Sequence, residues 1–149
     1  MNLDLIKFNI EDYLKKNNLT LYDIKYEREG EDYFLRIFID NDDYNITLED
    51  LAKANDYIST MLDNMDKDLP PYYLEVSSPG AEREIRNKEE ITKAINSYVH
   101  VELEKDIYEG YLVDFQDEVV VIKVNFKGRI KNLKIDLKDI KFFRYAVKI

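Results

Sequence analysis

Residues 72–83 read YYLEVSSPGAER, and this stretch decides the fold. Leu74 and Val76 alternate with polar neighbours, which is the pattern of a half-buried strand. Pro79 and Gly80 fit the two central positions of a type II turn, because proline presets φ and glycine supplies a positive φ. The stretch therefore predicts that one domain closes here and a second begins, with domains at residues 1–83 and 84–149.

The sequence before this stretch carries helix and strand patterns in turn. Apolar residues recur at helical spacing over residues 3–14 and again over residues 51–65. Between them, residues 22–26 and 34–39 alternate as two strands joined by a turn at Gly30. Thr47, with Asp50 three residues later, predicts the N-terminus of the second helix. The order of elements up to residue 77 is therefore helix, strand, strand, helix, strand.

The sequence after this stretch is mainly strand pattern. Asn87, with Glu90 three residues later, predicts a short helix, and strand patterns follow at 99–103, 108–115, 119–124, 130–135 and 143–147. A single helical turn is predicted at 137–140. Gly110 inside the second of these strands predicts a bend or a bulge. Five short strands with a kink glycine predict a small barrel of SH3 or Sm type, and the fold class is α+β.

The charge is divided unequally along the chain. The 149 residues carry 22 Lys and Arg against 31 Asp and Glu, a net charge of −9. Residues 1–85 hold 9 basic against 20 acidic residues (−11), whereas residues 86–149 hold 13 against 11 (+2). The total argues against a simple nucleic-acid binder, which normally presents a basic surface. The division predicts that the two halves face different partners.

Nothing in the sequence indicates a membrane or secreted protein. No apolar run approaches the length of a membrane span, and Met1 opens directly into an amphipathic pattern without a signal sequence. The absence of cysteine excludes disulfides and thiol chemistry. We expect a cytoplasmic protein.

No pattern of catalytic or metal-binding residues is present. His100 is the only histidine, so neither a Cys-His pair nor a histidine-rich zinc site can form. The four glycines stand far apart, which excludes a P-loop, a dinucleotide fingerprint and the GXXG clamp. The acidic run starting at Asp40 lacks the glycine and the final glutamate of an EF-hand. We predict no enzymatic activity, no metal and no cofactor.

One stretch of the second half is basic. Its cations surround Phe126 and lie mostly on the hairpin between the third and fourth strands of the predicted barrel; they are Lys123, Lys127, Arg129, Lys131, Lys134, Lys138 and Lys141. Two explanations fit this pattern equally well: the cations face solvent without a ligand, or they contact phosphate groups.

Several segments resemble the bacterial ribosome maturation factor RimP family. The run from Tyr73 to Gly80, followed by Glu82-Arg83, is similar to the family's signature. Residues 35–40 with 46–50 are similar to its second strand and the entry to its second helix, and residues 135–140 to its penultimate barrel segment. The resemblance covers nearly the whole chain in the right order. Asn96 stands where the family commonly has glycine.

The resemblance implies an N-terminal αββαβ domain followed by a small SH3-like or Sm-like β-barrel. It implies a cytoplasmic, non-enzymatic assembly factor that binds immature 30S subunits and helps a basic small-subunit protein of the decoding region join the 16S rRNA. We expect a monomer. The signature residues are Glu75, Ser77, Ser78, Pro79, Gly80 and Arg83, and the candidate rRNA contacts are Lys127, Arg129, Lys131 and Lys134.

Two other classes of protein fit the sequence. A stand-alone Sm-like module would bind naked RNA tightly through its barrel. A peptide adaptor would use an SH3 groove, which needs a cluster of exposed aromatic rings such as Tyr108, Tyr111 and Phe142.

Overall fold

The computed structural model describes residues 1–65 and 70–148. The chain divides into two compact units, the N-terminal unit Met1–Pro79 and the C-terminal unit Gly80–Ile149, and each has its own hydrophobic core. The sequence predicts a domain boundary after residue 83, and this boundary stays a prediction. Among the described residues, no helix has the length and apolar character needed to cross a membrane.

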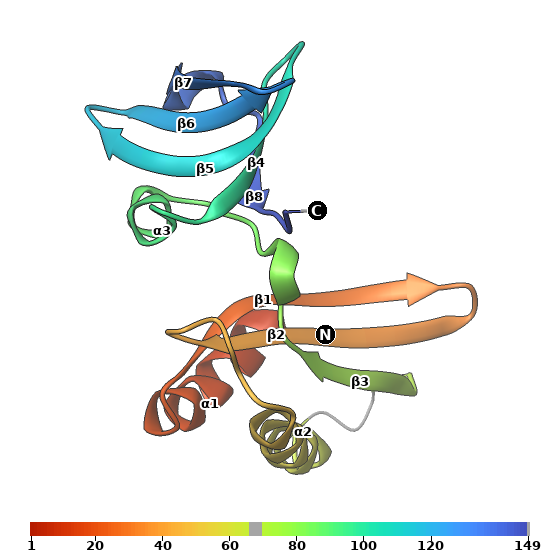
Figure 1. Ribbon diagram of the computed structural model, residues 1–149. Coiled ribbons are helices and arrows are strands. Elements are labelled where there is room, and N and C mark those ends of the chain that lie inside the picture. The colour runs from red at the N-terminus through yellow and green to blue at the C-terminus, as the bar shows by residue number, and fades with distance from the viewer. Residues whose placement is uncertain (66–69, 149) are drawn as a thin grey trace. The chain divides into compact units, whose positions relative to one another are not determined.

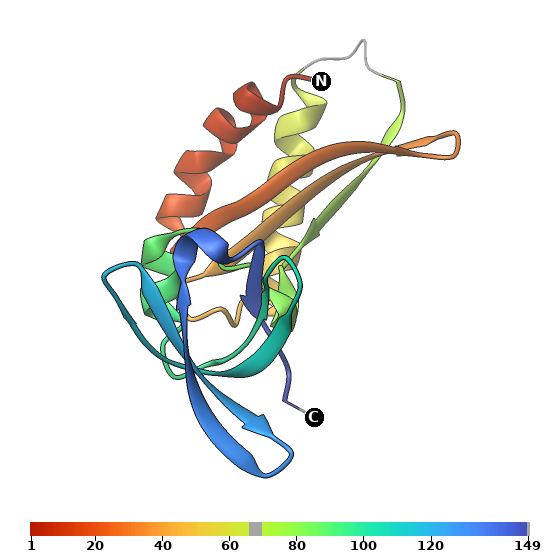
Figure 2. The same cartoon turned by 90° about the horizontal axis from the view of Figure 1, so that it is seen from above.

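The N-terminal unit has the predicted order of elements. These are α1 (Leu3–Lys16), β1 (Leu19–Glu29), β2 (Asp32–Asn41), α2 (Leu48–Asp63) and β3 (Tyr72–Ser77). The sheet has the order β1-β2-β3, in which β1 and β2 form an antiparallel hairpin and β3 runs parallel to β2. A parallel pair needs a long connection, and α2 supplies it. Both helices cover the same face of this sheet (Figures 1 and 2).

The helices begin where side chains satisfy their free N–H groups, and they bury one stripe each. The Asn2 side chain accepts from the backbone N–H of Leu5 at 3.1 Å, and Thr47 Oγ1 accepts from Asp50 N–H at 3.1 Å. The buried stripes pack on alternate residues of β2 that are fully buried. The buried residues are Ile6, Ile10, Leu14, Ala54, Ile58, Leu62, Leu35, Ile37 and Ile39. Burial of these apolar stripes holds the unit together.

The C-terminal unit contains η1 (Gly80–Glu82), α3 (Lys88–Lys93), β4 (Tyr98–Glu102), β5 (Ile107–Gln116), β6 (Val119–Phe126), β7 (Arg129–Asp136), η2 (Leu137–Asp139) and β8 (Phe142–Tyr145). Its antiparallel sheet has the order β7-β6-β5-β4-β8. The edge strands β7 and β8 do not pair with each other within the described part of the chain. The α+β class with two sheets is confirmed, whereas a closed SH3-like or Sm-like barrel is not. The last strand ends at Tyr145, short of the predicted Val147.

Gly110 permits a close approach of two strands. The register of β5 shifts between Leu112 and Asp114, so the bulge lies beyond Gly110 and not at it. A Cβ atom on Gly110 would lie 2.2 Å from the carbonyl oxygen of Lys123 on β6. Only glycine fits at this position, because the obstructing atoms belong to the neighbouring backbone.

The departure at Asn96 has a conformational explanation. Asn96 has a φ of +78°, and its N–H donates to the carbonyl of Leu112 at 2.6 Å. This left-handed conformation suits glycine, and asparagine tolerates it better than most other residues do. Asparagine can therefore stand at a position where the resembled family commonly has glycine.

Candidate functional site

The signature turn stands at the junction of the two units. Ser77 ends β3 opposite Phe38 of β2, and Ser78 and Pro79 are half-buried between β3 and η1. Gly80 has a φ of +77°, which is the positive value that a type II turn requires at its third position. The N-terminal unit ends at Pro79, and the C-terminal unit begins at Gly80. Glycine suits this first position because it adopts a positive φ without strain.

Replacing Gly80 tests this assignment. We expect Gly80→Val to cost about 1–3 kcal/mol of stability, because valine is strained at positive φ, whereas a Cβ atom at this position would have no other atom within 4 Å. Gly80→Asn should cost less, since asparagine tolerates this conformation. Thermal unfolding measures both, with Ala81→Val as the control. Equal melting temperatures for Gly80→Val and the wild type would show that the turn carries no such constraint.

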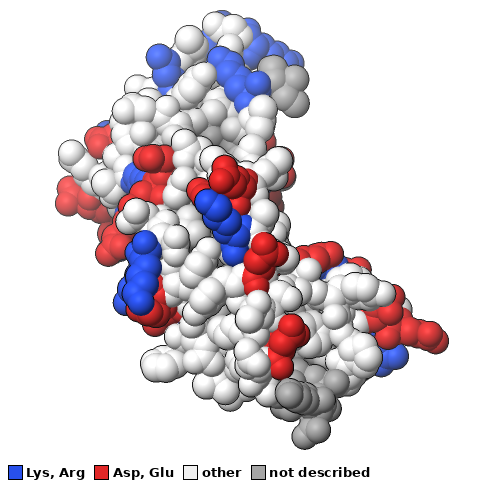
Figure 3. Space-filling view, turned by 90° about the horizontal axis from the view of Figure 1, so that it is seen from below, with Lys and Arg blue, Asp and Glu red and all other residues white. Residues whose placement is uncertain are grey.

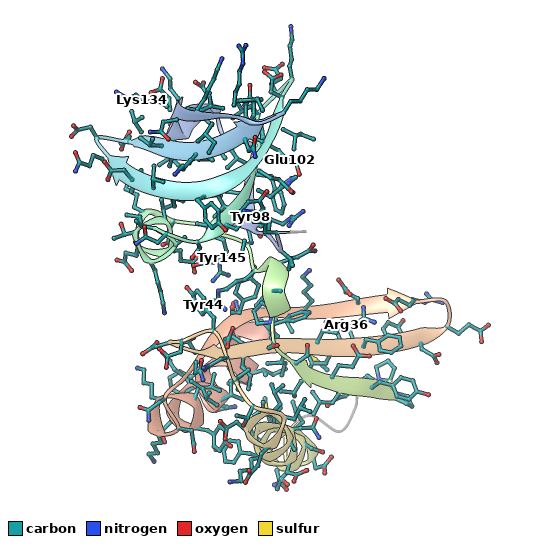
Figure 4. The ribbon with its side chains drawn as sticks, viewed as in Figure 1. Arg36, Tyr44, Tyr98, Glu102, Lys134 and Tyr145 are labelled. Atoms are coloured by element: carbon teal, nitrogen blue, oxygen red, sulfur yellow. The ribbon has the colours of Figure 1, made fainter. Side chains whose placement is uncertain are left out.

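Glu75 of the signature belongs to an ion network on the face of the N-terminal sheet that the helices leave open. Arg36 Nε donates to Glu75 Oε2 at 2.8 Å, and Arg36 Nη1 donates to Glu29 Oε1 at 2.7 Å and to Glu27. Figure 4 marks Arg36 on this face. Hydrogen bonds to the three carboxylates raise the pKa of Arg36, and the hydrogen bond from Arg36 lowers the pKa of Glu29. Glu75 thus joins β3 to β2 and helps to fix the pairing of the two strands.

Arg83 of the signature lies in the C-terminal unit and is 6% exposed. Its Nη2 lies 4.0 Å from Glu90 Oε2, and its carbonyl oxygen accepts from Tyr145 N–H at 2.8 Å. Arg83 therefore helps to attach the segment after the turn to β8. The signature residues thus form two groups, one in each unit.

Five of the seven cations of the basic stretch lie on the hairpin of β6 and β7, and we call residues 123–134 the basic arm; Lys138 lies in η2, and Lys141 lies between η2 and β8. Its two-residue turn consists of Lys127 and Gly128, with φ values of +52° and +91°, as a type I′ turn requires. The Asn125 side chain accepts from Gly128 N–H at 2.8 Å and fixes this turn. The candidate Lys127 is thereby held at the tip of the arm.

The four candidate rRNA contacts do not share one face of the arm. Arg129 and Lys131 pair with Phe126 and Val124 and lie on the face that continues the core. Lys134 pairs with Val121 and lies on the opposite, outer face. All four side chains are exposed and make no ion pair with any described residue. Figure 3 shows Lys and Arg side chains gathered at one end of the C-terminal unit, and Figure 4 marks Lys134 on β7.

Sequence reasoning missed a hollow on the outer face of the C-terminal sheet. Tyr98 of β4, Tyr111 of β5 and Lys123 of β6 are opposite one another on neighbouring strands, so they form a row across this face. They line a hollow of about 290 Å³ together with Asn125 and Lys148. We call this the outer hollow. Cross-strand pairing assembles it, and the sequence of one strand does not reveal that pairing.

The three aromatic residues proposed for a peptide groove do not form one cluster. Tyr108 and Tyr111 are three positions apart on a regular part of β5, so their side chains lie on opposite faces of the sheet. Tyr108 packs against the core and meets Phe126, whereas Tyr111 meets Tyr98. This arrangement removes the cluster that the peptide-adaptor alternative requires.

His100 also has a role that its sequence context did not reveal. It is 8% exposed, and both ring nitrogens lie near carboxylates: Nδ1 is 2.6 Å from Glu109 Oε2, and Nε2 is 2.7 Å from Glu102 Oε2. His100 thus links β4 to β5 and engages the carboxylate of Glu109. The i, i+2 spacing of His100 and Glu102 on one strand was the available signal.

Comparison with known families identifies the N-terminal half. A family model described as the RimP N-terminal domain matches residues 9–82. These residues run from within α1 to the end of η1. The match therefore includes the three-stranded sheet, the second helix, and the signature up to Gly80.

Proposed function

The chain belongs to the RimP family, and on that premise we propose that it is a ribosome maturation factor that binds immature 30S subunits and assists their maturation without catalysis. The observation that carries this proposal is the match of residues 9–82 to the RimP N-terminal domain. The signature turn near the end of that match lies close to the point where the charge balance changes, from −11 over residues 1–85 to +2 over residues 86–149, and this change supports two different kinds of partner. The protein acts in the cytoplasm as a monomer and needs no cofactor.

The C-terminal unit is proposed as the part that contacts the 16S rRNA. Lys127, Arg129, Lys131 and Lys134 are its candidate contacts, because they are exposed and their charges are not neutralised by described neighbours. Neutralising phosphates releases counterions and supplies affinity that falls with salt. We infer further that this unit is an open variant of the SH3-like or Sm-like barrel; the strand order, with β4 between β5 and β8, supports that inference.

The N-terminal unit is proposed to meet a basic small-subunit protein of the decoding region. Residues 1–85 carry a charge of −11, and opposite charge speeds the encounter of two proteins. On the open face of the sheet, the guanidinium of Arg36 lies among three carboxylates, so this group of side chains is negative overall. An acidic surface can hold a basic protein before that protein reaches RNA.

Sedimentation of a cell lysate through a gradient tests the proposal. We expect the protein in the fractions of free small subunits and their precursors, and not with large subunits or translating ribosomes. A stand-alone Sm-like RNA module would instead distribute over all particles that expose RNA. Equal recovery with large subunits would contradict the proposal.

A further inference from the structure

The outer hollow has the composition of a site for an unpaired nucleobase. We propose that it binds one base of a single-stranded RNA segment, with the neighbouring phosphates on Lys123 and Lys148. The inference rests on the proposed function in taking RNA as the partner. It adds a defined site to the charged contacts of the basic arm, and it assigns Tyr111 the central role.

Tyr111 supplies the surface on which a base can stack. It is 39% exposed, and its ring forms a T-shaped pair with that of Tyr98, with ring centroids 5.2 Å apart and an interplanar angle of 78°. This contact holds the ring of Tyr111, and the exposed part of the ring is available for stacking. Stacking on an aromatic side chain tolerates every base, because each base has a π-face.

The cations of the hollow are available for phosphate. Lys123 makes no ion pair with a described residue, and Lys148 Nζ lies 5.1 Å from the centroid of the Tyr111 ring. Lys148 is exposed, and a cation–π contact at an exposed site is weaker than base stacking. A base can therefore replace the ammonium over the ring, after which Lys148 can contact a phosphate.

The one carboxylate of the hollow is already engaged. Glu109 lines the hollow, but its Oε2 lies 2.6 Å from Nδ1 of His100. Glu109 therefore already has a partner on the neighbouring strand β4.

The neighbourhood of the hollow favours single-stranded RNA over other partners. Asn125 and Ile130 extend the hollow onto the basic arm, so a strand leaving the hollow meets further cations. Each nucleotide of single-stranded RNA has a planar base that can stack on Tyr111 and a phosphate that can contact Lys123. A duplex hides the faces of its bases and could use only the cations.

The test measures binding of the full chain to a short oligoadenylate by fluorescence anisotropy at low salt. We expect Tyr111→Ala to weaken binding about tenfold and Tyr111→Phe to stay within about twofold of the wild type, since phenylalanine keeps the ring. Lys123→Gln should lower the salt slope by about 0.7, the value for one phosphate contact with a single strand. Tyr73→Ala is the matched control, because Tyr73 is an exposed tyrosine, 59% accessible, of the N-terminal unit.

Three results would overturn the site: no measurable binding by the wild type, unchanged binding by Tyr111→Ala, or equal binding of duplex RNA of the same length. If Tyr111→Ala fails to fold, the salt slope of Lys123→Gln decides whether the site stands. Lys123 is exposed, so its replacement should leave folding intact. Oligoadenylate binding by the wild type that Tyr111→Ala weakens, in a chain that never sediments with small subunits, would support the site and refute the proposed function. Sedimentation with small subunits but no oligoadenylate binding would refute the site alone.

Discussion

Reversing the four candidate cations of the basic arm, as Lys127→Glu, Arg129→Glu, Lys131→Glu and Lys134→Glu together, should weaken binding to the small-subunit precursor by about a hundredfold or more at low salt. Each lost phosphate contact removes about one unit from the slope of log affinity against log salt, so the salt dependence should also flatten by about three to four units. The fold should survive, because the four side chains are exposed and make no ion pair with a described residue. Affinity for purified precursor particles over a range of salt measures both effects.

The matched control for this variant carries the same change of charge on the N-terminal unit. Lys7, Lys15, Lys16 and Lys53 are exposed lysines of α1 and α2, and their reversal should leave the salt slope for RNA contacts unchanged. A similar loss in the two variants would mean that total charge, and not the basic arm, determines the affinity. An unchanged salt slope in the arm variant would remove the arm from the interface.

Gly110→Ala should destabilise the C-terminal unit by about 3 kcal/mol, at the upper end of the usual range for overpacking. The added methyl would lie 2.2 Å from the Lys123 carbonyl oxygen and 2.9 Å from its carbon, and neither backbone atom can move without disturbing the pairing of β5 with β6. For a unit of this size, such a loss lowers the melting temperature by more than about 10 °C. Thermal and denaturant unfolding measure it.

Gly30→Ala provides the comparison. Gly30 also requires glycine-like freedom, with a φ of +63°, but no atom lies within 4 Å of its missing Cβ. Its replacement should cost only about 1 kcal/mol, the lower end of the range for a residue held in a sparsely populated conformation. If the two variants unfolded at the same temperature, the close approach of β5 and β6 would not constrain the fold.

The elements of the N-terminal unit could be predicted because their signals are local. Thr47 and Asp50 lie within one turn of each other, and the alternation of Leu35, Ile37 and Ile39 identifies the buried face of β2 without knowledge of its neighbours. The same holds for the short helix that Asn87 begins, whose side chain accepts from Glu90 N–H at 2.9 Å. Each pattern depends on residues that are close in sequence.

The features that sequence analysis missed depend on pairing between strands. Arg36 meets Glu75 only because β3 lies parallel to β2 in one register, although 39 positions separate the two residues. Tyr111 and Lys123 become neighbours only in the register of β5 with β6, which the shift near Leu112 alters. Register is set by the whole sheet and its bulges. The basic arm was predicted, but its division between two faces was not, for the same reason.

Direct binding to purified ribosomal particles tests the central claim. The chain should bind small-subunit precursors that lack the basic protein of the decoding region more tightly than completed small subunits, because the precursor still exposes the RNA that this protein will cover. Large subunits should bind this chain no more tightly than they bind an unrelated acidic protein of the same size. Tighter binding to completed small subunits, or equal binding to large subunits, would contradict the proposal that this chain is a factor for small-subunit maturation.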